Sequence, residues 1–111
     1  MTPEGKIEKY FIKRVKETGG EQRKLKWIGR NGAPDRLAWW PPKLSVECRS
    51  ATNVIPGDIV PVFAFVELKR PKKGAEDHQT REHNRLRAAG FKVYVADTIE
   101  AVDSVILALT S

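Results

Sequence analysis

The chain has 111 residues, and its 20 Lys and Arg against 14 Asp and Glu give a formal net charge of +6 at pH 7, so we expect one basic domain. Its 41% hydrophobic and 31% charged residues are typical of a globular chain rather than a disordered one, and the single Cys48 excludes an internal disulfide and fits a reducing compartment. No apolar run is long enough to span a membrane and the first residues lack the apolar core of a signal peptide, so we expect neither segment.

The first predicted element is a helix that begins at Thr2-Pro3, a hydroxyl N-cap followed by proline at the first helical position. Apolar residues recur after it at helical spacing: Ile7, Phe11, Ile12 and Val15. Gly19-Gly20 ends the pattern. Glu8 lies on or beside the apolar stripe, where a carboxylate is costly unless another group pairs with it.

Two strands are expected next. Residues 23–29 alternate basic and apolar side chains, as a half-buried strand does. After the turn residues 31–34, a second strand is predicted over 35–40 and is expected to end at Pro41-Pro42. Residues 43–61 are predicted to be an insertion or long loop with little regular structure, apart from a short strand that Leu44 could start.

Val62 to Leu68 is the most apolar segment and is typical of a central strand covered on both faces. A helix over about 76–89, a strand over 91–96 and a final helix after the capping-box residues 97–100 complete the chain. Strand, helix and strand over 62–96 imply a parallel pair with a right-handed crossover. The predicted order is α-β-β-β-α-β-α, one α/β domain over residues 1–111 with a mixed central sheet flanked by helices.

The acidic residues suggest a site. Asp35 follows Pro34 at the start of a strand, and Glu67 and Lys69 lie two apart at the end of the buried strand, on one face. If the two strands are neighbours, Asp35 and Glu67 converge at one end of the sheet, where Glu8 could join them. Clustered carboxylates repel one another and normally gather around a cation, and oxygen ligands select Mg²⁺ or Mn²⁺.

Such a metal site with a lysine beside it suits hydrolysis of a phosphodiester, because the metal polarises a phosphoryl oxygen and activates water. Each motif alone has an ordinary structural explanation: Glu-x-Lys at a strand end is usually a solvated ion pair, and Pro-Asp is usually a turn. Their combination with an unusually apolar strand, a following helix and a basic chain favours catalysis.

Three parts of the sequence resemble the VRR-NUC domain of the PD-(D/E)xK nuclease superfamily: residues 32–37 (GAPDRL), residues 65–71 (FVELKRP) and Gln79 on the next helix. The similarity covers nearly the whole chain, including the closing segment from Gly90. It implies a restriction-endonuclease-like core and Mg²⁺- or Mn²⁺-dependent cleavage of DNA.

The resemblance also implies roles for individual residues. Asp35 and Glu67 correspond to the metal-binding carboxylates, and the backbone carbonyl of Leu68 would be an additional ligand. Glu8 corresponds to the acid of the first helix, which can reach the metal through water. Lys69 resembles the catalytic lysine and Gln79 the glutamine close to the site. These five positions, with the backbone of Leu68, are the predicted catalytic set: Glu8, Asp35, Glu67, Lys69 and Gln79.

Basic residues near the predicted site are candidates for DNA contacts: Arg36, Arg70, Lys72, Lys73, Arg81 and Arg85. Charged runs are also common on solvated faces, so those on the helix are equally explained by solubility. His78 and His83 are five positions apart, which separates them by more than a third of a helical turn and makes them a poor zinc pair. His83 is therefore expected to be a hydrogen-bonded helix residue rather than a ligand or general base. Trp39 and Trp40 point to opposite faces of their strand, so at least one is expected in the core; the other, with Trp27, could contact a second subunit or an unpaired base.

Small stand-alone members of the family are associated with homodimers that resolve four-way (Holliday) DNA junctions. A symmetric junction needs two cuts and a monomer of this size offers one site, which independently favours a homodimer. The alternatives are a flap or duplex nuclease with the same chemistry, and a non-catalytic DNA-binding module that kept the fold. The expected setting is DNA repair and recombination in the cytoplasm of a bacterial or phage-infected cell, in association with the nucleoid.

Overall fold

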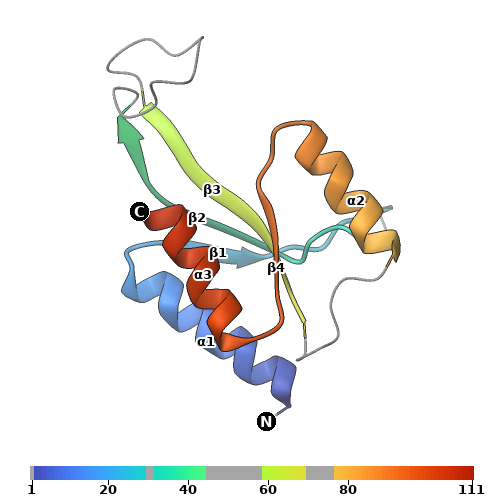
Figure 1. The fold of residues 1–111 in the computed structure, drawn as a ribbon, viewed down its shortest axis with the longest axis horizontal. Coiled ribbons are helices and arrows are strands. Elements are labelled where there is room, and N and C mark those ends of the chain that lie inside the picture. The colour runs from blue at the N-terminus through green and yellow to red at the C-terminus, as the bar shows by residue number, and fades with distance from the viewer. Residues whose placement is uncertain (1, 30–31, 45–58, 70–76) are drawn as a thin grey trace.

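The computed structural model describes residues 2–29, 32–44, 59–69 and 77–111 (Figure 1). These residues form, in chain order, α1 (Pro3–Glu17), β1 (Glu21–Lys24), β2 (Arg36–Leu44), β3 (Ile59–Leu68), α2 (Asp77–Ala88), β4 (Val93–Ala96) and α3 (Ile99–Thr110). The strands make one mixed sheet in the order β1-β2-β3-β4, antiparallel except for the parallel pair β3–β4. The predicted element order and mixed sheet are confirmed.

The helices are divided between the two faces of the sheet. α1 and α3 pack against each other and against β1, β3 and β4, and α2 lies apart from them beside β4 (Figure 1). Because successive strand residues point to opposite faces, β2 and β3 each send alternate side chains to the two sides. We call these the α1–α3 face and the α2 face.

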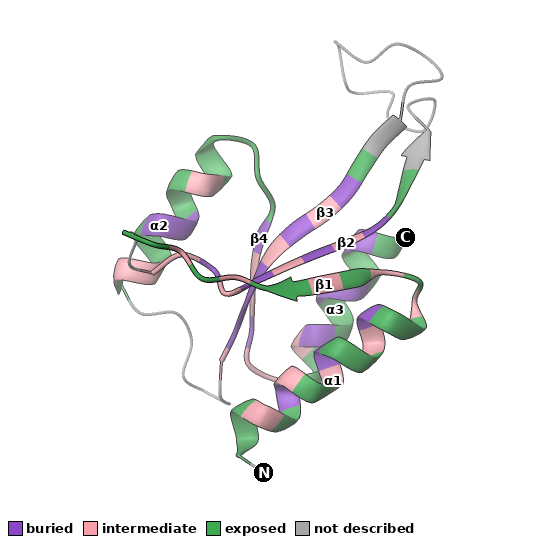
Figure 2. Ribbon diagram, turned by 180° about the vertical axis from the view of Figure 1, so that it is seen from behind, coloured by how far each residue is buried: buried purple, intermediate pink, exposed green. Residues whose placement is uncertain are grey.

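The core lies between the α1–α3 face and its two helices, and Figure 2 shows the buried stretches of β2 and β3 beside them. It contains apolar side chains from both the strands and the helices: Ile7, Phe11, Val15, Ala38, Trp40, Ala64, Val66, Val102, Ile106 and Leu109. Full burial of one such aliphatic or aromatic side chain is worth about 1.5–3 kcal/mol. This face therefore supplies most of the stability of the fold.

The helix ends confirm the capping predictions. The Thr2 hydroxyl accepts a hydrogen bond from the Gly5 N–H at 3.0 Å, and the Thr98 hydroxyl accepts one from the Ala101 N–H at 3.0 Å. α1 stops before Gly19, whose φ of +85° is a conformation that other residues rarely adopt. These capping contacts set where α1 and α3 begin against the sheet.

The first strand differs from its prediction. β1 spans Glu21–Lys24 instead of 23–29, because Lys24 pairs with Arg36, the first residue of β2, and the turn before β2 offers no further strand partner. A ladder-like contact follows, in which the Leu25 N–H donates to the Asp35 carbonyl at 2.8 Å. The basic and apolar alternation beyond Lys24 therefore belongs to a connecting segment.

The second and third strands are longer than predicted. β2 continues through Pro41-Pro42 to Leu44, and β3 begins at Ile59, so both ends of the predicted insertion 43–61 are strand. The described β1 pairing stops at Trp39, and the β2–β3 register shifts between Trp40 and Lys43, so neither proline has to donate a ladder hydrogen bond there. The middle of that insertion, residues 45–58, lies outside the described part of the chain.

Among the described helices, none has the length and apolar character needed to cross a bilayer.

Candidate active site

The two predicted carboxylates lie next to each other at one end of the sheet. β2 begins at Arg36, which pairs with Val66 of β3, so the antiparallel register places Asp35 opposite Glu67. Lys69 follows directly after the end of β3. The expected convergence of the Pro-Asp and Glu-x-Lys motifs thus follows from the pairing of β2 with β3.

Each carboxylate has one oxygen that is buried without a hydrogen-bond partner among the described residues: Asp35 Oδ1 and Glu67 Oε1. Burial raises the pKa of Asp35, although a hydrogen bond from the Leu68 backbone N–H opposes the shift. Burial and the charge of Asp35 raise the pKa of Glu67 to about 7, against the lowering effect of Lys69. The ionised forms of both carboxyl groups are therefore disfavoured when no cation is bound.

These properties fit a hard divalent cation. An unpaired buried acceptor is costly, and a cation bound to both carboxylates would satisfy the oxygens and remove their repulsion. No group of three or more His, Cys, Asp or Glu side chains that could hold a metal gathers within the described residues. Two carboxylates are nevertheless a common protein contribution to a Mg²⁺ site, since water and substrate phosphate complete the shell.

Glu8 has a different partner from the one expected. Its Oε1 lies 2.6 Å from Nη2 of Arg36, whose side chain is 4% exposed. The same guanidinium donates from Nη1 to Gln22 Oε1 at 2.8 Å. The ion pair explains how a carboxylate is tolerated beside the apolar stripe of α1, and the structure does not bring Glu8 into a group with Asp35 and Glu67.

Another acid of α1 affects the site and was missed in the sequence. The charge of Glu4 contributes to the raised pKa of Glu67. Glu4 lies one helical turn before Glu8 and so on the same side of α1. That spacing was a usable signal, because it predicts two acids on the side of α1 that approaches the sheet.

Lys69 lies close enough to the pair to matter electrostatically. Its side chain is half-buried, and its charge lowers the pKa of Glu67 and that of His83. Its backbone N–H donates to the Ala96 carbonyl at 2.9 Å, which anchors the end of β3 to β4. The predicted lysine is thus placed beside the carboxylates by the sheet itself.

Gln79 is placed near the site by a close backbone contact. Gly32, with φ of +81°, packs so tightly on the first turn of α2 that a Cβ there would lie 2.8 Å from the His78 carbonyl and 3.0 Å from Gln79 Cα. Only glycine fits this approach. The loop that leads into Asp35 therefore holds the start of α2, and Gln79 with it.

His83 is the second residue whose contact the sequence did not reveal. It is 1% exposed, and its Nε2 lies 3.8 Å from Glu67 Oε1. Burial lowers the pKa of His83, and the charges of Arg87 and Lys69 act in the same direction. The spacing of residues along α2 could not indicate which strand residue His83 meets, because that depends on how α2 packs against the sheet.

The predicted DNA-contacting residues fall into three groups. Arg36 is buried against Glu8 and Gln22, which leaves its guanidinium turned away from solvent. Arg81 and Arg85 are exposed on α2, and Arg85 lies 3.5 Å from Glu82. The remaining three, Arg70, Lys72 and Lys73, lie outside the described residues.

The tryptophans separate as their alternation predicted. Trp40 is in the core and donates from Nε1 to the Thr18 hydroxyl at 2.9 Å. Trp39 points to the α2 face, where the Arg23 guanidinium lies 5.0 Å from its ring centroid. Trp27 packs 5.7 Å from the ring of Phe65 and donates to the Pro34 carbonyl at 2.7 Å.

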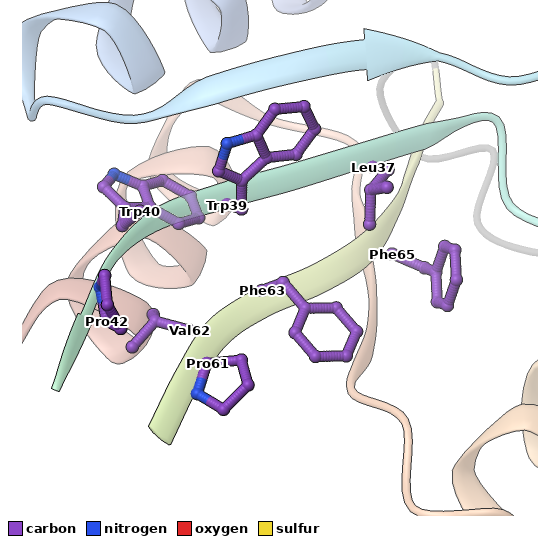
Figure 3. Close-up of a pocket in the computed structure, with 8 residues that line it drawn as sticks. All are labelled: Leu37, Trp39, Trp40, Pro42, Pro61, Val62, Phe63 and Phe65. Carbon is purple, nitrogen blue, oxygen red and sulfur yellow. The ribbon is translucent and has the colours of Figure 1, made fainter. Parts of the chain in front are cut away.

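An apolar groove of about 520 Å³ opens along β2 and β3 (Figure 3). We call it the aromatic groove; its lining residues are Leu37, Trp39, Trp40, Pro42, Pro61, Val62, Phe63 and Phe65. Phe91 packs edge-on against Phe63 and Phe65, with centroid distances of 6.3 and 5.6 Å. The groove is adjacent to the carboxylates, because Leu37 lies two residues after Asp35 and Phe65 lies two residues before Glu67.

The mixed sheet with helices on both faces, and with paired carboxylates where β2 begins and β3 ends, defines a restriction-endonuclease-like α/β fold. A solved structure described as "VRR_NUC domain" superposes with a TM-score of 0.70 and 35% identity, over 96% of this chain and 97% of that one. A protein of Acyrthosiphon pisum secondary endosymbiont phage 1, named "Putative nuclease p44", is 36% identical over 95 residues, 86% of this chain and 83% of that protein. No protein-family model matches the sequence. The chain belongs to the VRR-NUC family of nucleases.

Proposed function

We propose that the protein is a Mg²⁺- or Mn²⁺-dependent endodeoxyribonuclease. The observation that carries the proposal is the pair of buried, unpaired oxygens on Asp35 and Glu67, with Lys69 beside them. Two carboxylates whose ionised forms are disfavoured become an effective site once a divalent cation is bound. A purely structural pair would be expected to have its own hydrogen-bond partners.

Asp35, Glu67 and the Leu68 carbonyl would hold the cation, which supplies a polarised phosphoryl oxygen and a water of lowered pKa. Hydrolysis then forms a bond from the water oxygen to phosphorus and breaks the bond to one bridging oxygen, which takes a proton. Lys69 stabilises the charge that develops on the phosphate, as a half-buried ammonium does more strongly than one in bulk water. Gln79, at the start of α2, orients water or phosphate at the rim.

Arg36 and Glu8 have a supporting task in this proposal. Arg36 ties the first residue of β2 to α1 through Glu8 and to β1 through Gln22. That arrangement fixes the backbone next to Asp35, so we assign Arg36 to positioning Asp35 rather than to contacting DNA. The exposed Arg81 and Arg85 remain proposed phosphate contacts, together with Arg70, Lys72 and Lys73.

The substrate we propose is branched DNA, in particular a four-way junction cut by a homodimer. A second copy supplies the second active site that two symmetric cuts need. We place that copy on the aromatic groove, whose lining offers apolar surface and few polar partners for a phosphate backbone. Beside the groove Arg23, which lies over the ring of Trp39, is already paired with Glu21 at 3.2 Å, so its charge is not left free for a phosphate.

The interface is tested by sedimentation of the wild type, Phe63→Glu and Ile28→Glu. Phe63 lines the groove, whereas Ile28 is 92% exposed and lies outside it, so it serves as the matched control. We expect a dimer for the wild type and Ile28→Glu, and a monomer for Phe63→Glu. A dimer that survives Phe63→Glu would place the partner elsewhere.

The activity is tested by cleavage of labelled four-way junction, flap, duplex and single-stranded DNA with Mg²⁺, Mn²⁺ or EDTA. Paired symmetric nicks in the junction, abolished by EDTA, support a dimeric resolvase that would act on DNA in the cytoplasm. Cleavage of flap or duplex DNA instead would support the proposed nuclease chemistry and contradict the four-way junction as substrate. Tight binding without cleavage of any DNA supports the alternative of a non-catalytic binding module.

A further inference from the structure

Two buried polar atoms with no hydrogen-bond partner face each other across the α2 face of the sheet. His83 Nε2 and Glu67 Oε1 both lack a partner among the described residues, and they are 3.8 Å apart. One is a nitrogen that can carry a proton, and the other is an acceptor of the proposed metal-binding carboxylate. The gap is slightly longer than a hydrogen bond and smaller than a water molecule would need.

His83 is held in place from both ends of α2. At the first turn, Gly32 packs against Gln79 with no room for a side chain. At the last turn, Arg87 donates from Nη2 and Nε to the Val93 carbonyl at 2.8 and 3.2 Å. α2 is therefore fixed against β4, and the imidazole between these contacts is presented to Glu67 on a rigid support.

The imidazole of His83 can donate a hydrogen bond from Nε2, which lies opposite a buried oxygen of Glu67 that has no hydrogen-bond partner among the described residues. It also lies in no group of three metal-binding side chains among the residues described, which argues against direct ligation.

We propose that His83 is a positioning residue that donates a hydrogen bond from Nε2 to Glu67 Oε1 when the cation is bound. The bond would leave the other oxygen of Glu67 directed at the cation. The inference rests on the proposed function, because it assigns a support to the proposed metal ligand. Removing such an outer partner of a metal ligand typically weakens metal binding by about 10–100-fold.

The test compares the full chain with His83→Phe, which fills the space but cannot donate, and with His83→Gln, which keeps an N–H donor. Mn²⁺ affinity is measured by calorimetry at pH 8 on protein without DNA, and folding is checked by thermal unfolding without metal. We expect about 10–100-fold weaker Mn²⁺ binding for His83→Phe, with recovery in His83→Gln. His78→Phe, at the other histidine of α2, is the control and should bind Mn²⁺ as the wild type does.

A measurement on the unmodified protein covers the case in which His83→Phe does not fold. The imidazole ¹⁵N resonances of both histidines are followed by NMR during addition of Mg²⁺. We expect the Nε2 resonance of His83 to shift and that of His78 to stay unchanged.

Unchanged Mn²⁺ affinity in folded His83→Phe, or Mg²⁺ binding without any change at His83, would overturn the inference and leave the proposed nuclease intact. Absence of Mn²⁺ and Mg²⁺ binding by the wild type would instead overturn the proposed metal site, and the role of His83 with it.

Discussion

The two faces of the sheet are built from the same strands and have opposite chemistry. On the α1–α3 face, Ala38, Trp40, Ala64 and Val66 pack against the helices in a continuous apolar core. On the α2 face, alternate residues of the same strands, Leu37, Trp39, Phe63 and Phe65, line much of the aromatic groove, and beside it lie buried acceptors that have no hydrogen-bond partner among the described residues. A shift of one residue along a strand thus separates side chains that stabilise the fold from side chains that cost stability.

The contrast between the faces places the functional groups on the side of the sheet that contributes less to stability. Buried acceptors that lack partners lower stability, so they persist where a ligand or reaction requires them. The fold can tolerate this cost on the α2 face because the core on the α1–α3 face supplies most of its stability.

Asp35→Asn is expected to produce the largest effect, on the α2 face. Loss of a metal-binding carboxylate should lower the cleavage rate about a thousandfold or more, because several kcal/mol of transition-state stabilisation are lost. DNA binding measured by gel shift should persist or strengthen, since a negative charge that repels phosphate is removed. Cleavage at the wild-type rate would show that the metal site lies elsewhere.

Phe11→Ala and Phe63→Ala compare the two faces directly. Phe11 is 0% exposed in the core, so its truncation should cost about 3–5 kcal/mol of unfolding free energy in urea titrations. Phe63 is half-buried in the aromatic groove, and its truncation should cost less than half as much. Equal costs would mean that the groove is as well packed as the core.

The pKa of Glu67 predicts how stability varies with pH. Folding raises this pKa from the ordinary 4.5 to about 7, so the fold favours the protonated carboxyl. Without divalent cations, unfolding free energy should decrease by on the order of 3 kcal/mol as the pH rises from below 4.5 through about 7. Glu67→Gln should remove this contribution, and Mn²⁺ should reduce it by stabilising the ionised form. A pH profile identical in wild type and Glu67→Gln would contradict the raised pKa.

Arg36→Met tests whether Arg36, on the α1–α3 face, positions Asp35 on the α2 face. Among these changes it should have the smallest effect on stability. The side chain of Arg36 is 4% exposed, but that of its partner Glu8 is 41% exposed and can be hydrated again. We expect a loss of about 1–2 kcal/mol of unfolding free energy in urea titrations. The loss of Mn²⁺ affinity should be larger than in Lys26→Met, a control at an exposed position after β1. Equal Mn²⁺ affinities would show that Arg36 does not position Asp35.

Features that depend on residues near one another in the chain were determined by the sequence. The Thr2 and Thr98 caps, the apolar stripe of α1 and the strand-helix-strand order each arise from short-range spacing and capping chemistry. The Pro-Asp and Glu-x-Lys motifs also predicted that Asp35 lies beside Glu67. That prediction needed one assumption, that β2 and β3 are neighbouring strands, and the structure pairs these strands.

The tertiary structure decided the contacts that join distant elements. Glu8 pairs with Arg36 and His83 faces Glu67 because packing brings α1 and α2 to particular strand positions, and no spacing within a helix encodes those positions. β2 runs through Pro41-Pro42 because the β1 pairing ends before them and the β3 register shifts there. Local structural propensities depend on residues close together in the sequence, whereas the contact partner of a side chain depends on strand register and on how the helices pack against the sheet.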